Sequence, residues 1–361
     1  MGILDIITVV IFSVAVLATG ISLSKSGKDL KGFFGGGGNI PWAMSGLSLF
    51  MGFFSAGTFV VWGSIAYSCG LTAIIIQLTM AVAGFAVGTF IAPRWHRTGA
   101  LTAAEYITAS FGQATQKTYT YLFLAVSVFT SGSFLYPVAK ILEVAAGVPL
   151  TASILALGLF CIIYTSLGGL RGVMVTDVLQ FVILFTAVII AVPLSFGKVG
   201  GVQEFFARVP EGFFRCFSGE YTPWFIFAFC LYNAVFIGGN WSYVQRYTSV
   251  RTERDAQKVG WLFGALYLIS PVLWMLPPMI YRVYNPGLSG LENENAYLLM
   301  CREALPNGLL GLMLGGMIFA TASSLNGTLN ISAGVFTNDI YKRLRPGSSD
   351  KALIRVARLS T

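Results

Sequence analysis

The sequence has few charged residues and a single histidine, and both shortages limit what the protein can be. Charged residues make up 11% of the 361 residues and hydrophobic residues 55%, with a mean hydropathy of +0.74. A soluble domain needs more charge than this to cover its surface. His96 lies in a basic segment, and the five cysteines form no CxxC or metal-spaced pair. We therefore expect a membrane protein that is not an enzyme, because buried hydrolytic or metal chemistry is poorly supported.

Charge is also absent from long stretches of the chain, and each stretch is a candidate membrane span. A transmembrane helix needs about 20 consecutive apolar residues. The uncharged windows are 6–24, 32–93, 118–139, 144–170, 178–197, 221–245, 259–281 and 304–338. Each window has room for one span and 32–93 has room for two, so the sequence predicts an all-α, multi-pass membrane protein with nine spans.

The basic residues are unequally divided between the two sides that these spans define. If the N-terminus is outside, the cytoplasmic segments carry 17 of the 23 Lys and Arg, and the external segments 198–220 and 282–303 carry five. The cytoplasmic segments are then 25–41, 93–117, 168–175, 244–258 and 342–361. This distribution obeys the positive-inside rule and predicts a cell-membrane protein with an external N-terminus. The net charge of +8 then reflects contact with the lipid bilayer, not nucleic-acid binding.

Two of the expected spans are rich in residues that weaken a helix. Five glycines and several serines lie between Trp42 and Gly70, and the span 223–242 contains GGNW at 238–241. Gly and Asn loosen a helix and free backbone carbonyls. The two spans are five apart, one in each half of the chain, which is the pattern of an inverted-repeat transporter. Alternatively, the glycines only permit close helix packing.

The segment 315–341 is long enough to cross a bilayer and has no charge before Asp339. Residues 320, 323 and 324 share one face of this helix, so the adjacent hydroxyls of Ser323 and Ser324 could face an ion together. A hard cation such as Na⁺ prefers oxygen ligands of this kind. The alternative is that both serines bond back to carbonyls one turn earlier in their own helix.

At these residues the chain resembles the sodium:solute symporter family, which includes bacterial sugar, proline, pantothenate and sialic-acid symporters. The resemblance covers essentially the whole chain, through motifs in a fixed order. They are FFGGGGNIPWAMSGLSLFMGFFSAGTF (33–59), AYSCG (66–70), TAAEYITASFG (102–112), SLGGLRGVMVTDVLQ (166–180), NWSYVQRYTSVRTERDAQK (240–258) and ASSLNGTLNISAGVFTNDIY (322–341). The resemblance implies the LeuT-type fold, in which a leading helix precedes two inverted five-helix repeats.

Matched to that fold, residues 1–361 form one transmembrane domain. The leading helix is 5–24, the first repeat is 42–197 and the second repeat is 222–361. The core helices are expected at 42–70, 72–92, 118–148, 150–167, 175–197, 222–242, 258–281 and 305–341. These are eight core helices where the family has ten, so we expect a truncated core with an incomplete second repeat.

The resemblance also implies a sodium site between the first broken helix and core helix eight. Its ligands would be the backbone oxygens of Met51, Phe54 and Ala320 and the hydroxyls of Ser323 and Ser324. Another candidate is Asp177, which follows Thr176 at the start of core helix five. It could lie on the ion-release path or assist a second sodium site, or it could be a helix N-cap. Asn326 and Gly327 replace the further hydroxyls of relatives with a second sodium site, which favours one sodium.

For the solute, the resemblance to the sugar-transporting branch points to Thr58, Gln77 and Asn240. Amide and hydroxyl groups both donate and accept hydrogen bonds, which suits a polyol. Tyr267 occupies the place where sugar-transporting relatives have a lysine. Gln77 and Asn240 could equally be hydrogen-bonded between helices without touching solute.

Together these features predict a sodium-coupled symporter of a small polar solute, most plausibly a sugar, that works by alternating access. Its partners would be that solute, the coupling Na⁺ and the bilayer. The alternatives are a sodium symporter for an amino acid or monocarboxylate, and a non-transporting membrane sensor or scaffold. The sequence does not indicate the coupling ratio or the oligomeric state.

Overall fold

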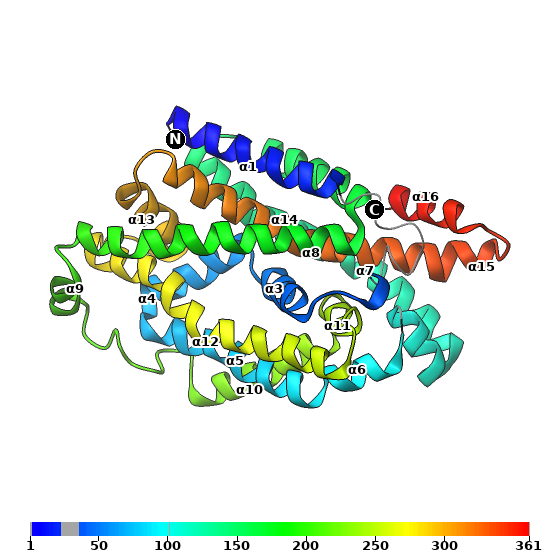
Figure 1. The fold of residues 1–361 in the computed structure, drawn as a ribbon. Coiled ribbons are helices and arrows are strands. Elements are labelled where there is room, and N and C mark those ends of the chain that lie inside the picture. The colour runs from blue at the N-terminus through cyan, green and yellow to red at the C-terminus, as the bar shows by residue number, and fades with distance from the viewer. Residues whose placement is uncertain (1, 23–35, 101, 361) are drawn as a thin grey trace.

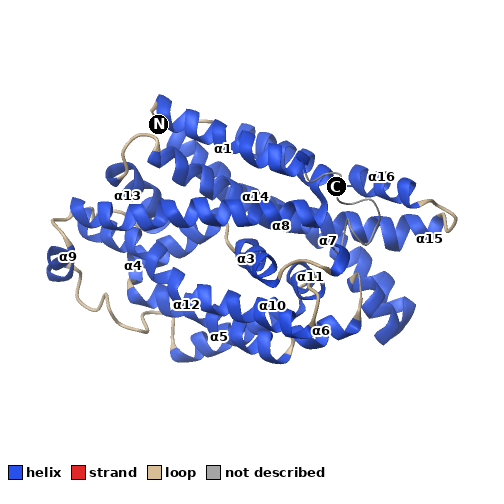
Figure 2. Ribbon diagram, in the orientation of Figure 1, coloured by secondary structure: helices blue, strands red, loops and turns tan. Residues whose placement is uncertain are grey.

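A computed structural model describes residues 2–22, 36–100 and 102–360, and in these ranges the protein is built from helices joined by loops, without a strand (Figure 2). Residues 25–35 of the expected loop 25–41 are not among the described residues. The same is true of residues 23 and 24, the end of the expected leading helix. The helices lie roughly along a common direction and form an elongated bundle (Figure 1).

The helices alternate between long apolar segments and short pieces that follow breaks. Two short segments, η2 and η4, are π-helical, and η1 and η3 are 3₁₀-helical. In chain order the elements are α1 (Ile3–Ser22), η1 (Gly36–Gly38), α3 (Trp42–Phe53), η2 (Thr58–Trp62), α4 (Gly63–Cys69), α5 (Leu71–Phe90), α6 (Ala92–Thr98), α7 (Ala103–Ala146), α8 (Leu150–Lys198), α9 (Val202–Arg208), α10 (Pro223–Gly239), α11 (Trp241–Thr248), α12 (Glu253–Tyr284), η3 (Gly290–Asn295), α13 (Ala296–Ala304), α14 (Leu309–Val335), η4 (Phe336–Tyr341), α15 (Lys342–Leu344) and α16 (Asp350–Ser360).

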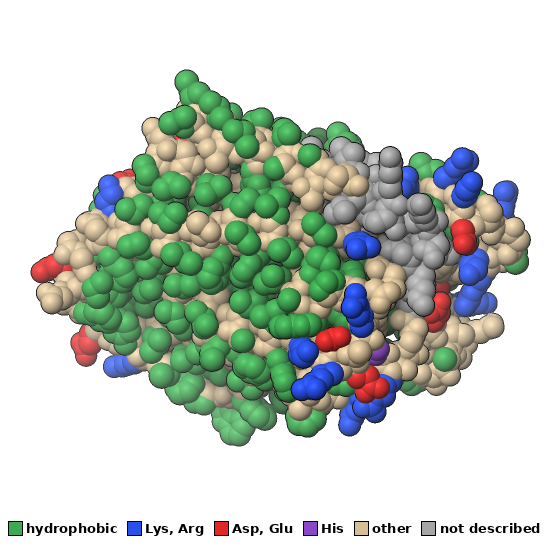
Figure 3. All heavy atoms as spheres, in the orientation of Figure 1, with side chains coloured by type: hydrophobic (Ala, Val, Ile, Leu, Met, Phe, Trp, Pro, Cys, Tyr) green, Lys and Arg blue, Asp and Glu red, His purple; other side chains and the backbone are tan. Residues whose placement is uncertain are grey.

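Where nine spans were expected, five of the described helices are long and apolar enough to cross a membrane, or seven if each bent pair is one span. The bent pairs are α3 with η2–α4 and α10 with α11, and two further apolar helices, Ile3–Val16 and Leu150–Ile163, are shorter. The five that are long enough to cross a membrane alone are Leu71–Phe90, Ala103–Glu143, Leu170–Lys198, Glu253–Tyr284 and Leu309–Leu344. On the face drawn in Figure 3, hydrophobic side chains cover the middle of the molecule and Lys and Arg gather toward one end.

Both expected helix breaks are present. The first span bends by 63° between α3 and η2–α4, and the second by 57° between α10 and α11. The residues that leave the helical conformation are Phe54, with φ −90° and ψ 121°, and Asn240, with φ −74° and ψ 124°. The glycines near the breaks therefore accompany the bends, while a phenylalanine and an asparagine adopt the extended backbone that makes them.

Helix α8 is one helical element over Leu150–Lys198, but its contacts with α14 show that the chain reverses direction within it. Taken in the order of α8, these contacts are Phe160 with Phe319, Thr165 with Asn326, Asp177 with Ser323, and Leu184 with Gly316. The position on α14 rises to Asn326 and then falls, so the first part of α8 runs parallel to α14 and the second part antiparallel. The two parts contain the apolar helices Leu150–Ile163 and Leu170–Lys198, where spans were expected at 150–167 and 175–197.

Helices α5 and α12 touch through glycines. A Cβ added to Gly260 would lie 2.4 Å from the Cα of Gly88, and one added to Gly84 would lie 2.6 Å from the ring of Phe263. Each helix carries the spacing GxxxG, at Gly84 and Gly88 and at Gly260 and Gly264. In membranes, small residues at this spacing let two backbones approach closely. The two helices are therefore in direct backbone contact.

The leading helix α1 is fixed to the start of α14 by an acid. The Oδ1 atom of Asp5 accepts the backbone N–H groups of Gly308 at 2.6 Å and Gly311 at 2.9 Å. A Cβ on Gly311 would lie 2.3 Å from the carbonyl oxygen of Asp5. Asp5 thus satisfies donors that the first turn of α14 leaves unpaired.

Candidate functional site

The break after α3 faces the middle of α14, and serine and threonine side chains of α14 satisfy its backbone groups. The hydroxyl of Ser324 lies 3.0 Å from the carbonyl oxygen of Gly52 and 3.2 Å from that of Phe54. The N–H of Ala56 donates to the hydroxyl of Thr321 at 2.7 Å. The open backbone is therefore held in place by side chains of another helix, away from water.

The five expected sodium ligands are all buried and lie on these two segments. Met51, Phe54, Ala320 and Ser323 are fully buried, and Ser324 is 6% exposed. Met51 lies in the last turn of α3, and its carbonyl accepts the N–H of Phe54 at 3.1 Å. The contact between Ser324 and the carbonyl of Phe54 joins the α3 part of the set directly to the α14 part.

The two serines donate across to other helices, which contradicts the alternative that they bond back within their own helix. Ser323 donates to the carboxylate of Asp177 on α8, and Ser324 donates to the break after α3. In contrast, Ser332 lies two turns further along α14 and does bond back, to the carbonyl of Thr328 at 2.9 Å. Back-bonding is therefore available to a serine of this helix, and the pair at 323 and 324 does not use it.

Asp177 is fully buried and accepts two hydroxyls from different helices. Ser323 of α14 donates to its Oδ1 and Ser48 of α3 to its Oδ2, each at 2.5 Å. Asp177 lies two turns past Leu170, where the second apolar part of α8 begins, so the alternative that it is a helix N-cap or first-turn acid is wrong. Its carboxylate instead connects the three helices that form the candidate ion site.

Arg246 is the main residue of this region that sequence reasoning missed. It was expected in the cytoplasmic segment 244–258, but it lies on α11 with 1% of its surface exposed. Its Nε donates to the hydroxyl of Ser48 at 3.3 Å, and it also bonds the carbonyl of Ser242. A Cβ on Gly327 would lie 4.0 Å from its terminal nitrogens. The signal that could have found it is the motif NWSYVQRYTSV, which places an arginine close to the second break.

A second residue that the sequence did not single out is Gln180, one turn after Asp177 on α8. It is fully buried, and neither atom of its amide has a hydrogen-bond partner among the described residues. An unpartnered buried amide is costly unless a ligand or water satisfies it. Because Gln180 shares a helical face with Asp177, its amide belongs to the same polar region.

A cavity of about 50 Å³ opens beside the serine pair. This volume exceeds what one water molecule needs. The residues that line it are Gly52, Thr130, Phe134, Phe236, Asn240, Ser242, Tyr243, Arg246, Ser323, Ser324, Gly327 and Thr328. The cavity therefore gives a small ion or water a place next to the expected ligands.

A larger cavity of about 260 Å³ lies on the other side of the broken helix and contains three of the four expected solute residues. Thr58 comes from η2, Gln77 from α5 and Tyr267 from α12. The residues that line it are Phe53, Thr58, Trp62, Gln77, Met80, Phe229, Tyr232, Asn233, Phe236 and Tyr267. None of these described lining residues is charged.

The fourth expected solute residue, Asn240, lines the smaller cavity instead. Its side-chain oxygen accepts the N–H of Ser242 at 2.9 Å and so caps the start of α11. Between the two cavities the rings of Phe53 and Tyr243 are stacked with their centroids 3.9 Å apart. Phe53 lines the larger cavity, Tyr243 the smaller and Phe236 both, so the two cavities meet at this cluster of three rings.

Comparison with known proteins identifies the family. The model of the sodium:solute symporter family matches residues 33–361. The sodium/glucose cotransporter of Vibrio parahaemolyticus is 29% identical over 98% of this chain and 72% of its own length. The sodium/sialic acid symporter SiaT of Proteus mirabilis is 27% identical over 96% of this chain and 73% of its own. Sodium/glucose cotransporter 1 of Mus musculus is 27% identical, and the chain spans 60% of its length.

A solved structure confirms the fold class. A Na⁺-coupled sialic acid symporter in a substrate-bound, outward-open state superposes with a TM-score of 0.88 at 25% identity, covering 99% of this chain and 79% of that one. The expected LeuT-type, all-helical transporter fold is therefore correct. The family model covers most of the chain, the motifs occur in its order, and the fold agrees. The chain belongs to the sodium:solute symporter family.

Proposed function

We propose that the protein is a sodium-coupled symporter of a small polar solute, a sugar or related compound, that works by alternating access. The observation that carries this proposal is the contact between Ser324 and the carbonyls of the broken first span. Its oxygens come from α3 and α14, and the neighbouring Ser323 bonds the buried carboxylate of Asp177; a hard cation prefers oxygen ligands of this kind. The named functions of the relatives, sodium/glucose and sodium/sialic acid symport, support the same reading.

Sodium would be held by the carbonyls of Met51, Phe54 and Ala320 and by the hydroxyls of Ser323 and Ser324. In the structure the hydroxyl protons of the two serines point to acceptors, which leaves oxygen lone pairs free for a cation. Asp177 adds the negative charge that compensates the ion. We further propose that Asp177 receives the ion on its path toward the cytoplasm, because its carboxylate contacts Ser323 directly.

The solute would bind in the larger cavity against Thr58, Gln77 and Tyr267. These side chains offer two hydroxyls and an amide, and aromatic rings form much of the remaining wall, an environment that suits the polar edge and apolar face of a sugar ring. Asn240, across the Phe53–Tyr243 pair, would reach the solute once those rings separate. An amino acid or monocarboxylate is the alternative solute; it would lack a cationic partner among the described lining residues.

We propose that the N-terminus is outside and that the end rich in Lys and Arg faces the cytoplasm of the cell (Figure 3). We also propose the division into a leading helix at 5–24, a first repeat at 42–197 and a second repeat within 222–361. The bent spans α3–α4 and α10–α11, which open the two repeats, support this division. No enzymatic activity is proposed, in keeping with membership of a transporter family.

The test is uptake of a solute panel into proteoliposomes with an inward sodium gradient, with potassium replacing sodium in the control. The panel contains hexoses, sialic acid, proline and pantothenate. The variant Ser323→Ala/Ser324→Ala should lose sodium-driven uptake, whereas Ser332→Ala, a serine of the same helix that bonds back, should keep it. If an amino acid is the only solute of the panel that is taken up, the alternative of an amino-acid symporter would take the place of the sugar symporter. Binding without any transport would support the sensor or scaffold.

A further inference from the structure

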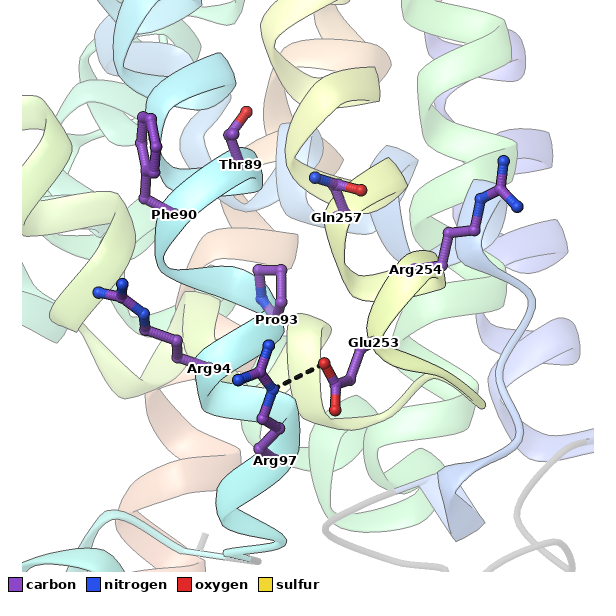
Figure 4. Close-up of a pocket in the computed structure, with 8 residues that line it drawn as sticks. All are labelled: Thr89, Phe90, Pro93, Arg94, Arg97, Glu253, Arg254 and Gln257. Atoms are coloured by element: carbon purple, nitrogen blue, oxygen red, sulfur yellow. Dashed lines mark hydrogen bonds and ion pairs between the residues drawn. The ribbon is translucent and has the colours of Figure 1, made fainter.

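We propose that a pocket at the basic end of α5 and α12 binds the headgroup of an anionic phospholipid. The pocket has a volume of about 470 Å³ and lies between the end of α5, helix α6 and the first turns of α12 (Figure 4). The residues that line it are Thr89, Phe90, Pro93, Arg94, Arg97, Glu253, Arg254 and Gln257. It is separate from the ion and solute cavities and shares no lining residue with them.

The charge of the pocket favours an anion. Three arginines line it against one glutamate, and Arg97 is paired with that glutamate, with Nε and the Oε2 atom of Glu253 2.7 Å apart. Arg94 and Arg254 form no ion pair with another described residue. Figure 4 shows them on opposite sides of the Arg97–Glu253 pair. Within the described part of the chain these two positive charges therefore have no ion-pair partner, and one lies on each side of the Arg97–Glu253 pair.

The position of the pocket favours a lipid over a soluble anion. Phe90 is 62% exposed at the end of the α5 span, and Trp261 on α12 is 42% exposed, next to the pocket. The Nε1 group of Trp261 donates to the hydroxyl of Thr89 at 3.0 Å, which holds the indole at this level. Aromatic residues mark the membrane–water boundary, where basic pockets between helices meet lipid headgroups. The acyl chains would pack against Phe90 and the exposed ring of Phe85.

The headgroup chemistry follows from the charge count. The guanidinium groups of Arg94 and Arg254 point away from each other in Figure 4, so a phosphate bonded by both requires these two flexible side chains to turn inward, where each binds phosphate oxygens through paired N–H donors. A phosphocholine headgroup would also bring a quaternary ammonium toward the arginines and lose part of that attraction. Phosphatidylglycerol brings the phosphate without the cation. The glycine contact between α5 and α12 fixes the two walls, so the pocket exists before the lipid arrives.

The experiment is lipid binding to the delipidated full chain in detergent, measured by native mass spectrometry with phosphatidylglycerol, phosphatidylcholine or inorganic phosphate. We expect one tightly held phosphatidylglycerol. In Arg94→Gln/Arg254→Gln its affinity should fall about tenfold or more, since each basic residue near an anionic lipid contributes on the order of 1 kcal/mol. The matched control removes two exposed basic residues from the same end of the molecule, Arg345→Gln/Lys351→Gln, and should keep the affinity. Arg94→Lys/Arg254→Lys keeps both charges, so its affinity for phosphatidylglycerol should lie between that of the unmodified protein and that of Arg94→Gln/Arg254→Gln.

Three results would overturn the proposal. One is equal retention of phosphatidylglycerol and phosphatidylcholine, which would mean that charge does not select the lipid. Another is an equal loss in the Arg345→Gln/Lys351→Gln control, which would mean that the effect belongs to net charge and not to this pocket. The third is displacement of the lipid by millimolar inorganic phosphate, which would make the pocket a site for a soluble anion. A melting temperature for each variant shows that it is folded.

Discussion

Asp177 and Arg246 are joined through one hydroxyl: Ser48 donates to Oδ2 of the aspartate and accepts from Nε of the arginine. Both charged groups are buried, and they come from α8 and α11 to the same hydroxyl of the broken helix α3. The arginine therefore compensates the acid through a shared serine and leaves Oδ1 for Ser323 of the candidate ion site. A buried charge with this support is held in place, and the support is lost if either partner is removed.

The first prediction concerns this pair. Asp177→Asn and Arg246→Gln should each lower the free energy of unfolding by about 3 to 5 kcal/mol, because each leaves the other charge buried and uncompensated. The double variant should cost clearly less than the sum of the two. Melting temperatures of all three variants, in one detergent and at one salt concentration, complete the cycle. Strictly additive losses would show that the two side chains are independent and that Ser48 does not couple them.

A second prediction concerns the backbone of the first break. Thr321→Val keeps the shape of the side chain but removes the acceptor of the Ala56 N–H, so we expect a loss of about 1 to 3 kcal/mol from the unpaired buried donor. The matched control is Thr186→Val, because Thr186 is exposed and bonds back to Val182 in α8. Thermal unfolding in sodium and in potassium would show whether the loss also weakens stabilisation by sodium. Equal effects of the two substitutions would contradict the role of Thr321.

The third prediction separates two roles of Asn240. Asn240→Ser keeps a side-chain oxygen that can cap α11, so stability should be retained, whereas Asn240→Ala should lose about 0.5 to 2 kcal/mol. If Asn240 also contacts the solute as proposed, Asn240→Ser should weaken solute binding while the melting temperature stays the same. Gln77→Leu provides the comparison in the larger cavity, and isothermal titration of each variant gives the affinities. If the solute affinity of Asn240→Ser is unchanged, Asn240 caps α11 but does not contact the solute.

A fourth prediction tests the glycine contact of α5 and α12. Gly260→Ala should destabilise the protein by about 2 kcal/mol or more, because its Cβ would lie 2.4 Å from the backbone of Gly88 and the helices would have to separate. Gly132→Ala in α7 meets no atom within 4 Å and should be neutral or stabilising by about 0.5 to 1 kcal/mol. Melting temperatures of the two variants measure the difference, and similar values would show that α5 and α12 can move apart without cost.

Much of the fold could be predicted because its causes are local. The uncharged windows and the residues that loosen a helix are properties of short segments, and they located the spans and both breaks. The reversal inside α8 was expected between the spans 150–167 and 175–197, but as a loop and not within one helix, because the contacts with α14 that describe it are not visible in the local sequence. Arg246 was misplaced for a similar reason. A rule that assigns each basic residue to a loop cannot recognise an arginine whose counter-charge, Asp177, is 69 residues away in the chain.

The candidate site divides in the same way. Ser323 and Ser324 could be found from their spacing and the family resemblance, because adjacent hydroxyls on one helix are visible in the sequence. Their acceptors lie on α8 and at the break after α3, so the choice between back-bonding and cross-helix bonding needed the structure. Asn240 was correctly placed at the second break, while its capping bond depends on a backbone angle that composition does not determine.

The glycine contact also sets a dimension of the larger cavity. Gln77 lies on α5 about three turns before Gly88, and Tyr267 lies on α12 about two turns after Gly260, the two glycines whose backbones touch. Helices in such contact cannot slide or spread without losing it, so the gap between the amide and the phenol is determined by four residues that have no side chains. The glycine contact therefore limits the width available to a solute, although it lies two or more turns from the residues that would bind the solute. Substitutions can thus change the size of the accepted solute and its hydrogen bonds independently in this protein.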